Sequence, residues 1–465
     1  MPDLDQVFKL QKQAYLEHPV LSLEERRRDL ERLRRFVVAH QDAICEAIDK
    51  DFGHRSRHET LMSDIMPTLL GLDHAIRHLR CWMKPQRRRV DWRLFPLARN
   101  RVLPQPLGVV GIIVPWNFPL FLSLGPLTSA LAAGNRVMVK MSEHSSHLCE
   151  LLNKRLPEFF DAARVQFFAE SGEVGAQFAR LKFDHLFFTG SSRVGRMVMR
   201  AAAENLCPVT LELGGRTPAV VCPDFPVDVA ARRIMFVKLL NAGQVCVSVN
   251  HVWLPHSAVD QFVAEASNFV RRRYGTLNST DYTAIITGHA FDRLVRALEE
   301  ARLAGATVIP LLDGPAMDVP GKKMVPHLVL NAPEHCALMR DEIFGPILPI
   351  RTYAELQEVV DDVNSGERPL AMYPFSYDQQ TVQRLLDQVM SGGVSVNNAL
   401  FHVAQTDLPF GGVGASGMGQ AQGYAGFCTF SHMRPVFYQS PVDTTRLFWP
   451  PYRNLIDLLL KFFNR

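Results

Sequence analysis

Apolar and polar positions follow a helical period through the first part of the chain. From Ser22 to Gly53, apolar residues recur among charged ones at three- and four-residue spacing, and Ser22 with Glu25 forms a capping box. We therefore predict one long amphipathic helix that ends at Gly53. A second helix is predicted over residues 63–83. Residues 91–106, rich in proline and arginine, are predicted to be extended.

The following segments alternate between short apolar runs and amphipathic stretches. The apolar runs predict strands over residues 107–116, 135–141, 164–171, 183–190 and 208–215. The stretches between them predict helices over residues 122–135, 147–160, 172–181 and 191–206. After Gly215 the pattern restarts, with strands over 218–223 and 251–255 and helices over 227–243 and 257–273. Such alternation predicts two doubly wound α/β domains with parallel sheets, and their boundary near residue 213.

Residues 106–135 carry no charged side chain and are numerous enough to span a bilayer. However, Pro115, Pro119 and Pro126 interrupt them, and a single membrane helix does not tolerate so many breaks. We therefore predict a buried strand and then a packed helix that ends at Gly134, and no membrane span.

The composition indicates an ordinary globular protein with a large core. Hydrophobic residues make up 47% of the chain and charged residues 21%, and the net charge of +4 is too small to indicate nucleic-acid binding. The run 87–89 of three arginines is interpreted as a solvated loop, with a phosphate site as the alternative. The eight cysteines form no CxxC pair, and the N-terminus has no apolar leader. We expect free thiols and a reducing, cytoplasmic location. No metal site is expected, because no cysteine or carboxylate lies at a spacing from the paired histidines that suits a metal ion.

The last residues of the chain predict a helix with one apolar stripe. The stripe consists of Leu455, Leu458, Leu459, Phe462 and Phe463. The helix is too short to span a membrane. We expect it to dock on the body of the protein or on a partner subunit, and weak peripheral membrane contact is the alternative.

Cys246 lies between two valines in an otherwise apolar region, which is typical of an inert core cysteine. However, Asn241, Gly243 and Gln244 interrupt the apolar pattern just before it, as a turn would. A nucleophile presented from a turn is therefore the alternative. Glu212 ends an apolar strand, so lost hydration should raise its pKa toward neutrality. That suits a general base, although a carboxylate that caps a turn fits the pattern equally well.

Further candidates follow other predicted strands. Gly190 and Gly195 flank a strand-to-helix turn that includes Ser191, where backbone N–H groups could bind a phosphate or simply form the turn. Lys140, Ser142 and Glu143 lie where open α/β sheets bind ligands, although Lys140 and Glu143 could equally form a surface ion pair. Asn117 is held between two prolines, and its amide could bind a developing oxyanion or local backbone.

Seven segments, in order along the chain, together resemble the aldehyde dehydrogenase superfamily. They are PWNFP (115–119), KMSE (140–143), FTGSSRVG (188–195), LELGG (211–215), NAGQVC (241–246), EIFGPILP (342–349) and PFGGVGASGMG (409–419). The short N-terminus, EAIDKDFG, TFSH and the WPPY tail are most similar to the class 3 and coniferyl aldehyde dehydrogenase branch.

The resemblance implies a role for each candidate. It implies that Cys246 is the nucleophile, that Glu212 is the general base, and that Asn117 and the backbone N–H of Cys246 form an oxyanion hole. It implies contacts with NAD, with NADP as the alternative, for Trp116, Lys140, Ser142, Glu143, Gly190, Ser191, Gly195, Glu342 and Phe344. Among these, Lys140 and Glu143 resemble the residues at the adenosine ribose, and Gly190, Ser191 and Gly195 those that flank the pyrophosphate. Glu342 and Phe344 resemble the residues that hold the nicotinamide ribose and ring.

The resemblance also implies a fold and a function. The fold would comprise a Rossmann-like cofactor-binding domain (1–90 and 107–212), a catalytic domain (213–412), a small β oligomerisation arm (91–106 and 425–440) and a C-terminal tail (441–465). The expected reaction is oxidation of an aromatic or medium-chain aliphatic aldehyde to the acid, by a homodimer, through a thiohemiacetal and a thioester on Cys246. A CoA-acylating dehydrogenase and a catalytically silent protein of the same fold are the alternatives.

Departures from the family pattern are few. Met141 replaces the usual proline after Lys140, Arg216 replaces the usual lysine after LGG, and Val247 to Asn250 follow the cysteine. None of these changes removes a candidate catalytic group. Glu143 favours NAD, because a carboxylate accepts a hydrogen bond from the ribose 2′-OH and repels a 2′-phosphate.

Overall fold

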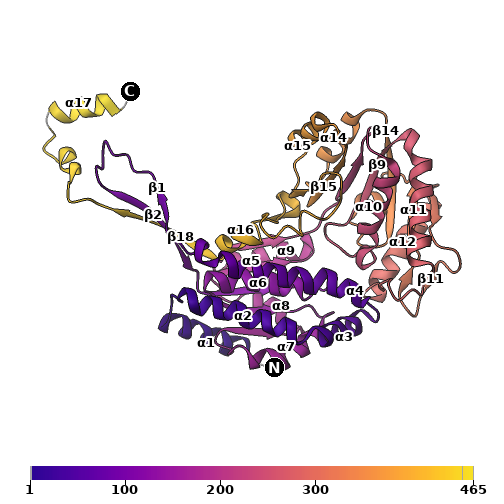
Figure 1. The fold of residues 1–465 in the computed structure, drawn as a ribbon, viewed down its shortest axis with the longest axis horizontal. Helices are drawn as coiled ribbons and strands as arrows, with labels where there is room; N and C mark the ends of the chain where they lie inside the picture. Colours follow the sequence, from indigo (N-terminus) through magenta and orange to yellow (C-terminus); the bar gives the residue numbers. More distant parts are fainter. Residues whose placement is uncertain (1–2, 453, 464–465) are drawn as a thin grey trace.

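The computed structural model describes residues 3–452 and 454–463, excluding the side chains of Leu455 and Phe462. The chain forms two large α/β bodies and a slender arm that projects from one of them (Figure 1). The N-terminal helices and the six-stranded sheet make the first body, and the seven-stranded sheet lies at the centre of the second. This mixed α/β architecture with parallel sheets confirms the predicted fold class.

The first body is built on a sheet of order β17-β7-β6-β3-β4-β5, in which β17 is the antiparallel member. Its strands are β3 (Val109–Ile113), β4 (Arg136–Lys140), β5 (Val165–Phe168), β6 (His185–Thr189), β7 (Val209–Glu212) and β17 (Gly417–Met418). The chain adds β4 and β5 on one side of β3, then β6 and β7 on the other, so the order reverses beside β3. Open α/β sheets bind ligands at the carboxyl ends of the strands at such a reversal.

Alternating side chains of these buried strands pack on helices at both faces of the sheet. Val110 and Ile112 belong to a core with α2, α3, α5, α6 and α7, while Val109 and Ile113 belong to a second core with α1, α8 and α9. The helices are α1 (Leu4–Glu17), α2 (Leu23–Ala39), α3 (Gln41–Phe52), α4 (Arg57–Thr60), the π-helical turn η1 (Leu61–Ile65), α5 (Met66–Trp82), α6 (Phe121–Ala133), α7 (Ser146–Arg155), α8 (Val174–Ala179), α9 (Ser192–Ala203) and α16 (Gly423–Thr429). Helix α6 ends at Gly134, which has a left-handed φ of 95°, as predicted.

The prediction of one continuous helix from Ser22 to Gly53 is wrong. The Ser22–Glu25 capping box is present, but the helix breaks at His40, whose φ of −121° and ψ of 20° are not helical. The apolar spacing is helical on both sides of the break, so the pattern could not show it. The break allows Phe36 of α2 and Ile48 of α3 to enter the same core from two directions.

The second body contains a sheet of order β10-β13-β14-β9-β8-β15-β16, parallel except for β10. Its strands are β8 (Pro218–Val221), β9 (His251–Pro255), β10 (Thr307–Pro310), β13 (His327–Leu330), β14 (Ile347–Tyr353), β15 (Ala371–Phe375) and β16 (Gly393–Val394), and β11 (Met317–Asp318) with β12 (Lys323–Met324) form a separate hairpin. Its helices are α10 (Val227–Leu239), α11 (Val259–Tyr274), α12 (Gly288–Leu303), α13 (Ala337–Arg340), α14 (Leu356–Ser365) and α15 (Gln379–Gln388).

The arm consists of β1 (Gln86–Arg88), β2 (Arg99–Pro106) and β18 (Ser431–Tyr438) in one antiparallel sheet. Beyond it, α17 (Asn454–Phe463) lies at the far end of the arm, away from both bodies (Figure 1). The Arg93 guanidinium of the arm lies 5.6 Å from the Phe463 ring centroid, so the tail helix contacts the arm of its own chain. Leu458 remains 67% exposed, and so the predicted apolar stripe is not covered along its whole length.

Helix α10 ends earlier than the apolar pattern indicated. The predicted helix over 227–243 stops at Leu239, and Asn241, Ala242 and Gly243 then adopt left-handed φ values of 52°, 51° and 77°. A side chain on Gly243 would collide with the carbonyl oxygen of Gly345. The turn before Cys246 is therefore packed directly against the backbone that follows Phe344.

We predict that Gly243→Ala destabilises the protein by about 2 kcal/mol or more, because alanine is strained at this φ and its Cβ also meets backbone atoms. Gly275→Ala is the matched control, since Gly275 has a similar φ of 68° but open space around it. Urea denaturation of both variants measures the difference. Equal destabilisation of the two variants would contradict the packing part of the prediction.

Candidate active site

Candidate residues from distant parts of the sequence meet at the carboxyl ends of the first sheet. Trp116 and Asn117 follow β3, Glu143 follows the end of β4, and Ser191 follows β6. These three strands are neighbours in the sheet, with β3 between β4 and β6. The loops therefore lie together at the point where the strand order reverses, which is the expected place for a dinucleotide.

Glu212 is the last residue of β7 and is only 4% exposed. Neither of its carboxylate oxygens has a hydrogen-bond partner among the described residues. Burial in this setting raises its pKa well above the usual value. Strand β17 pairs with β7 here, with Gly417 opposite Glu212, and so the motif at 409–419 covers the strand that carries this carboxyl group.

Cys246 lies in the segment between the left-handed turn and β9, and its side chain is half-buried. Burial, together with the negative charges of Glu342 and Glu212, raises the pKa of its thiol to about 12. The thiol is therefore protonated at neutral pH in this structure. The hydroxyl of buried Tyr373 donates to the Val247 carbonyl at 2.6 Å and fixes the backbone beside the thiol.

Asn117 lies against the same turn. Its side-chain Nδ2 donates to the carbonyl oxygen of Gln244 at 3.2 Å, and Asn241 Nδ2 donates to the carbonyl oxygen of Asn117 at 3.0 Å. Gln244 is anchored in turn, since its Nε2 donates to Ala284 and its Oε1 accepts from the N–H of Ile286. The structure thus brings Asn117 and Cys246 together through the segment 241–246.

Lys140, Ser142 and Glu143 form a polar group at the end of β4. Ser142 Oγ donates to Glu143 Oε2 at 3.2 Å. Burial opposes ionisation of Glu143, but a backbone N–H, His144 and Lys140 outweigh that effect and lower its pKa below the usual value. Glu143 is therefore ionised at neutral pH and can accept hydrogen bonds from a ligand.

Glu170 belongs to the same group, and the sequence analysis missed it. It follows β5, and its carboxylate forms an ion pair with the Lys140 ammonium. The available signal was its position near the end of the predicted strand over residues 164–171, which follows the strand of Lys140 in sequence order. Two carboxylates, Glu143 and Glu170, therefore flank one ammonium group at this edge of the sheet.

The turn at Gly190 leads into α9, and Ser191 caps this helix by accepting from the N–H of Val194. A Cβ on Gly190 would lie 2.6 Å from Phe188, and one on Gly195 would lie 2.8 Å from Leu213. Both glycines are thus required by close packing against the sheet. This packing leaves the N-terminus of α9 at the strand ends, where backbone N–H groups favour an anion.

Glu342 and Phe344 come from the second body. The Phe344 ring makes an edge contact with the Trp116 ring, with centroids 5.5 Å apart. A Cβ on Gly214 would collide with the Glu342 carboxylate, so this side chain lies over the segment that follows β7. The protein encloses this carboxylate closely enough to raise its pKa to about 7. One of its oxygens has no partner among the described residues.

Lys238 was also missed by the sequence analysis, since it lies in the apolar part of α10. It is buried, and its Nζ donates to the Val249 carbonyl at 2.9 Å. Burial lowers its pKa to about 7, while Glu342 raises it. Lys238 thus supports the backbone just after Cys246 and contributes to the charge around Glu342.

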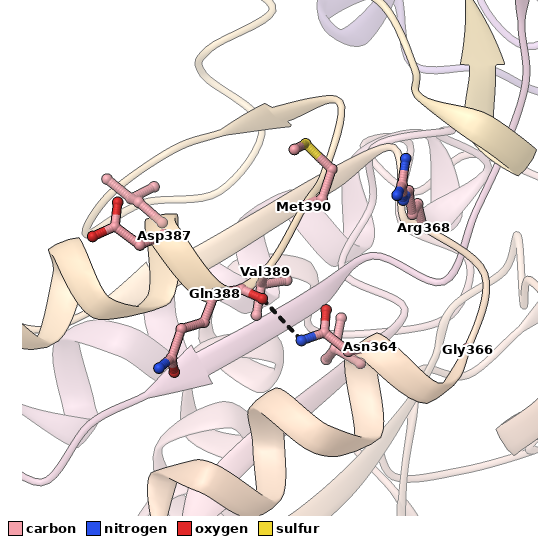
Figure 2. A pocket seen from close by; sticks show the side chains of 9 residues that line it. Asn364, Gly366, Arg368, Asp387, Gln388, Val389 and Met390 are labelled. Atoms are coloured by element: carbon pink, nitrogen blue, oxygen red, sulfur yellow. Dashed lines mark hydrogen bonds between the residues drawn. The ribbon is translucent and has the colours of Figure 1, made fainter.

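A separate cavity of about 320 Å³ shares none of these residues (Figure 2). It lies between the ends of α14 and α15, where Asn364 Nδ2 donates to the Gln388 carbonyl at 2.8 Å. Most of its lining comes from helix ends and a loop, and Arg368 and Asp387 are the charged members.

Within the described ranges, no cluster of histidine, cysteine or carboxylate side chains is suited to a metal ion. None of the helices in these ranges has the length and apolarity to cross a membrane.

Comparisons with known proteins agree with this arrangement. Residues 2–436 match the model of the aldehyde dehydrogenase family. The chain is 46% identical over 464 residues to a probable coniferyl aldehyde dehydrogenase of Pseudomonas aeruginosa, covering 99% of this chain and 96% of the relative. It is 43% identical to a coniferyl aldehyde dehydrogenase of Pseudomonas sp. HR199, covering 97% of this chain and 94% of the relative.

A solved structure is also similar. The substrate-bound AldH of Staphylococcus aureus superposes with a TM-score of 0.93 at 33% identity, and the match covers 100% of both chains. The predicted resemblance to the class 3 and coniferyl branch is therefore confirmed. The chain belongs to the aldehyde dehydrogenase family and is an NAD(P)-dependent aldehyde dehydrogenase.

Proposed function

We propose that this enzyme oxidises aromatic aldehydes of the coniferyl type to carboxylic acids, with medium-chain aliphatic aldehydes as secondary substrates. The relatives named as coniferyl aldehyde dehydrogenases support the aromatic substrate. The observation that carries the mechanism is Glu212, a carboxyl group buried without a hydrogen-bond partner among the described residues, whose negative charge acts on the Cys246 thiol. A buried carboxyl of raised pKa is suited to accept a proton from water near neutral pH.

The first step is attack of the Cys246 sulfur on the aldehyde carbon. The new C–S bond converts the carbonyl oxygen to an oxyanion, and the thiol proton passes to a carboxylate beside it. Asn117 Nδ2 and the backbone N–H of Cys246 are the donors assigned to the oxyanion. Asn117 Nδ2 carries a second hydrogen besides the one directed at Gln244, and this hydrogen is available to substrate.

The residues present fit a nicotinamide dinucleotide. Ionised Glu143 and the ammonium of Lys140 can hold a ribose, and the N-terminus of α9 can hold phosphate. Glu342 has one oxygen without a hydrogen-bond partner in the part of the chain that the structure describes. When bound, the cofactor would supply a hydride acceptor for the carbon attached to Cys246, so that the adduct on the sulfur is oxidised to a thioester. Glu212 then removes a proton from water, the water oxygen attacks the thioester, and the C–S bond breaks to release the acid and Cys246.

The alternative functions are not favoured. A catalytically silent protein would not need a buried, unpartnered carboxyl beside a cysteine, because such burial destabilises the fold. A CoA-acylating enzyme has no need for a base at Glu212, since a thiol takes the place of water.

The mechanism is tested by reduced-cofactor formation with coniferaldehyde, benzaldehyde, hexanal and acetaldehyde. Cys246→Ala should abolish turnover, and Glu212→Gln should release about one equivalent of reduced cofactor and then stall at the thioester. Mass spectrometry would detect the acyl-enzyme in the glutamine variant. If acetaldehyde were oxidised faster than the aromatic and medium-chain aldehydes, the substrate proposal would be wrong.

We expect the hydrolytic step to accelerate as pH rises through the raised pKa of Glu212, because only the carboxylate accepts the proton from water.

The same raised pKa should lower the stability of the folded protein as pH rises. A carboxyl whose pKa is raised on folding makes the protein less stable as pH increases above the unfolded value. Glu212→Gln should thus be more stable than the native enzyme at pH 8, and the two should differ least at pH 4. Denaturant titrations at both pH values give the comparison.

We also propose a preference for NAD over NADP. Glu143 and Glu170 place two carboxylates near Lys140, and Lys140 is already paired with Glu170. A 2′-phosphate at this position would be repelled by both carboxylates and would find no free ammonium group. Glu170→Gln should leave Lys140 free for the phosphate and lower the ratio of the NADP+ to the NAD+ dissociation constant by about tenfold.

Calorimetric titration with each cofactor measures this ratio without turnover. Glu173→Gln is the matched control, because Glu173 is an exposed carboxylate in the same loop. An unchanged ratio in Glu170→Gln, with NAD+ still bound, would remove Glu170 from the explanation of cofactor choice.

A homodimer in a reducing, cytoplasmic compartment completes the proposal. The projecting arm exposes Trp92, Leu97 and Phe437. Among the described residues β18 pairs only with β2, so an edge and apolar surface are available to a second copy. The eight cysteines are unpaired in the described structure, which suits such a compartment. Sedimentation at the mass of a single chain would contradict the dimer.

A further inference from the structure

The backbone carbonyl of Asn117 has a second donor besides Asn241. Arg55 Nη1 donates to it at 2.8 Å from the segment between α3 and α4. Arg55 is 2% exposed, and its guanidinium lies 5.0 Å from the ring centroid of Phe118, the residue after Asn117. One arginine therefore contacts the backbone and the neighbouring side chain of the loop that presents the Asn117 amide.

The same guanidinium forms an ion pair with Asp64 in the π-helical turn η1. Arg55 Nη2 lies 2.9 Å from Asp64 Oδ2, and neither side chain is exposed. The other oxygen, Asp64 Oδ1, accepts from the N–H groups of Leu120 and Phe121 at 3.1 and 3.0 Å. Arg55 and Asp64 thus hold the loop from Asn117 to Phe121 at both ends.

Glu59, one helical turn from Ser63 and Asp64, holds the opposite side of the site. Its Oε1 accepts from the N–H of Asn241 at 3.0 Å, and its Oε2 accepts from Thr283 Oγ1 at 2.5 Å. The short segment 55–64 is therefore bonded both to the loop of Asn117 and to the turn that precedes Cys246. Burial of the charged side chains of Arg55, Glu59 and Asp64 costs desolvation free energy. All three form hydrogen bonds with the candidate catalytic loops.

We infer that Arg55, supported by Asp64, is a positioning residue that fixes the direction of the Asn117 amide toward the oxyanion on the Cys246 adduct. This inference rests on the proposed role of Asn117. The guanidinium meets an oxygen of Asp64 and the carbonyl of Asn117 with two separate nitrogens, which a single ammonium group cannot reproduce in the same geometry. An error of about 1 Å in the position of a catalytic donor costs up to 10²-fold in rate.

The test is a double-mutant cycle with benzaldehyde and NAD+ as substrates. Asn117→Ala alone should lower kcat by about 10²-fold, the usual loss for one oxyanion donor. Arg55→Lys alone should lower kcat by about tenfold with less than a twofold change in KM, because the amide is misdirected and the substrate pocket is unchanged. In the Asn117→Ala background, Arg55→Lys should have no further effect on kcat, because the group it positions is gone.

Arg164→Lys is the matched control. Arg164 is also a buried arginine that pairs with an aspartate, Asp29, at 2.7 Å and donates to the carbonyls of Gly134 and Asn135. It lies at the opposite ends of the strands, beside the start of β4 and β5. Its replacement should lower the unfolding temperature comparably to Arg55→Lys but leave kcat within about twofold in both backgrounds. If Arg55→Lys does not fold, Asp64→Asn takes its place in the cycle, since it keeps the Oδ1 acceptor and loses the ion pair.

The outcomes separate the two claims. Equal losses from Arg55→Lys in the native and Asn117→Ala backgrounds, or a native kcat in Arg55→Lys, would overturn the positioning role while Asn117 kept its own. A native kcat in Asn117→Ala would instead overturn the proposed role of Asn117 and the inference that rests on it.

Discussion

The left-handed turn at Asn241, Ala242 and Gly243 is the constraint on which the rest of the site depends. Two of these residues have side chains, and a non-glycine residue in this region costs about 1–3 kcal/mol. The conformation persists because neighbouring groups require it. Glu59 accepts from the Asn241 N–H, Asn241 donates to Asn117, and Gly243 packs on the Gly345 carbonyl. The turn thereby ends α10 abruptly and brings the chain to Cys246 beside Asn117. Loss of this turn would separate the segments of Glu59, Asn117 and Gly345, since each of them is bonded to the turn or packed on it.

A second consequence of this packing is that ionisable groups are buried together with few hydrogen bonds to offset their lost hydration. Glu212 has no hydrogen-bond partner among the described residues, Glu342 lacks one on one oxygen, and the Cys246 thiol senses both. Water would stabilise their charged forms, and its exclusion favours the neutral ones. The arrangement weakens the fold, but it gives Glu342 a pKa of about 7, so that its protonation changes near neutral pH. Lys238 follows the same rule, because burial lowers the pKa of its ammonium to about 7.

Much of this could be predicted from the sequence, because the relevant signals are local. Gly134 ends α6 as expected, and the strands before Lys140, Gly190 and Glu212 stand out as apolar runs. The break at His40 could not be predicted, since the apolar spacing continues across it and only tertiary packing shows it. The end of α10 was predicted four residues too late, although Asn241 and Gly243 interrupt the apolar pattern there. The roles of the site residues came from the family resemblance, and local patterns left each of them open.

Contacts between residues far apart in the sequence could not be predicted, because no local pattern connects the two partners. Arg55 and Asn117 are 62 positions apart, and Glu59 and Asn241 are 182 apart, so no periodicity links them. A buried arginine in a short polar segment resembles any surface arginine until its partners are known. Glu170 and Lys140 lie on neighbouring strands, yet sequence alone does not give the strand order that makes them neighbours.

The chain passes from the first body to the second between β7 and β8, and it returns between β16 and β17. These two crossings determine how the residues of the first body are joined to those of the second. Glu212 ends β7 just before the first crossing, and β17, after the return crossing, pairs with it through Gly417. The N–H of Leu213 also donates to the Ser416 carbonyl at 3.1 Å, so both crossings are fastened to each other beside the carboxyl group. Cys246 belongs to the second body and Asn117 to the first, and they meet through direct bonds between loops. A change in the angle between the two sheets would therefore alter the Asn117–Gln244 contact while leaving Glu212 fixed to the crossings. Because Glu212, the proposed general base, is anchored at this junction, it keeps its position relative to the first body, and Cys246, the proposed nucleophile, is the group that such a motion would displace.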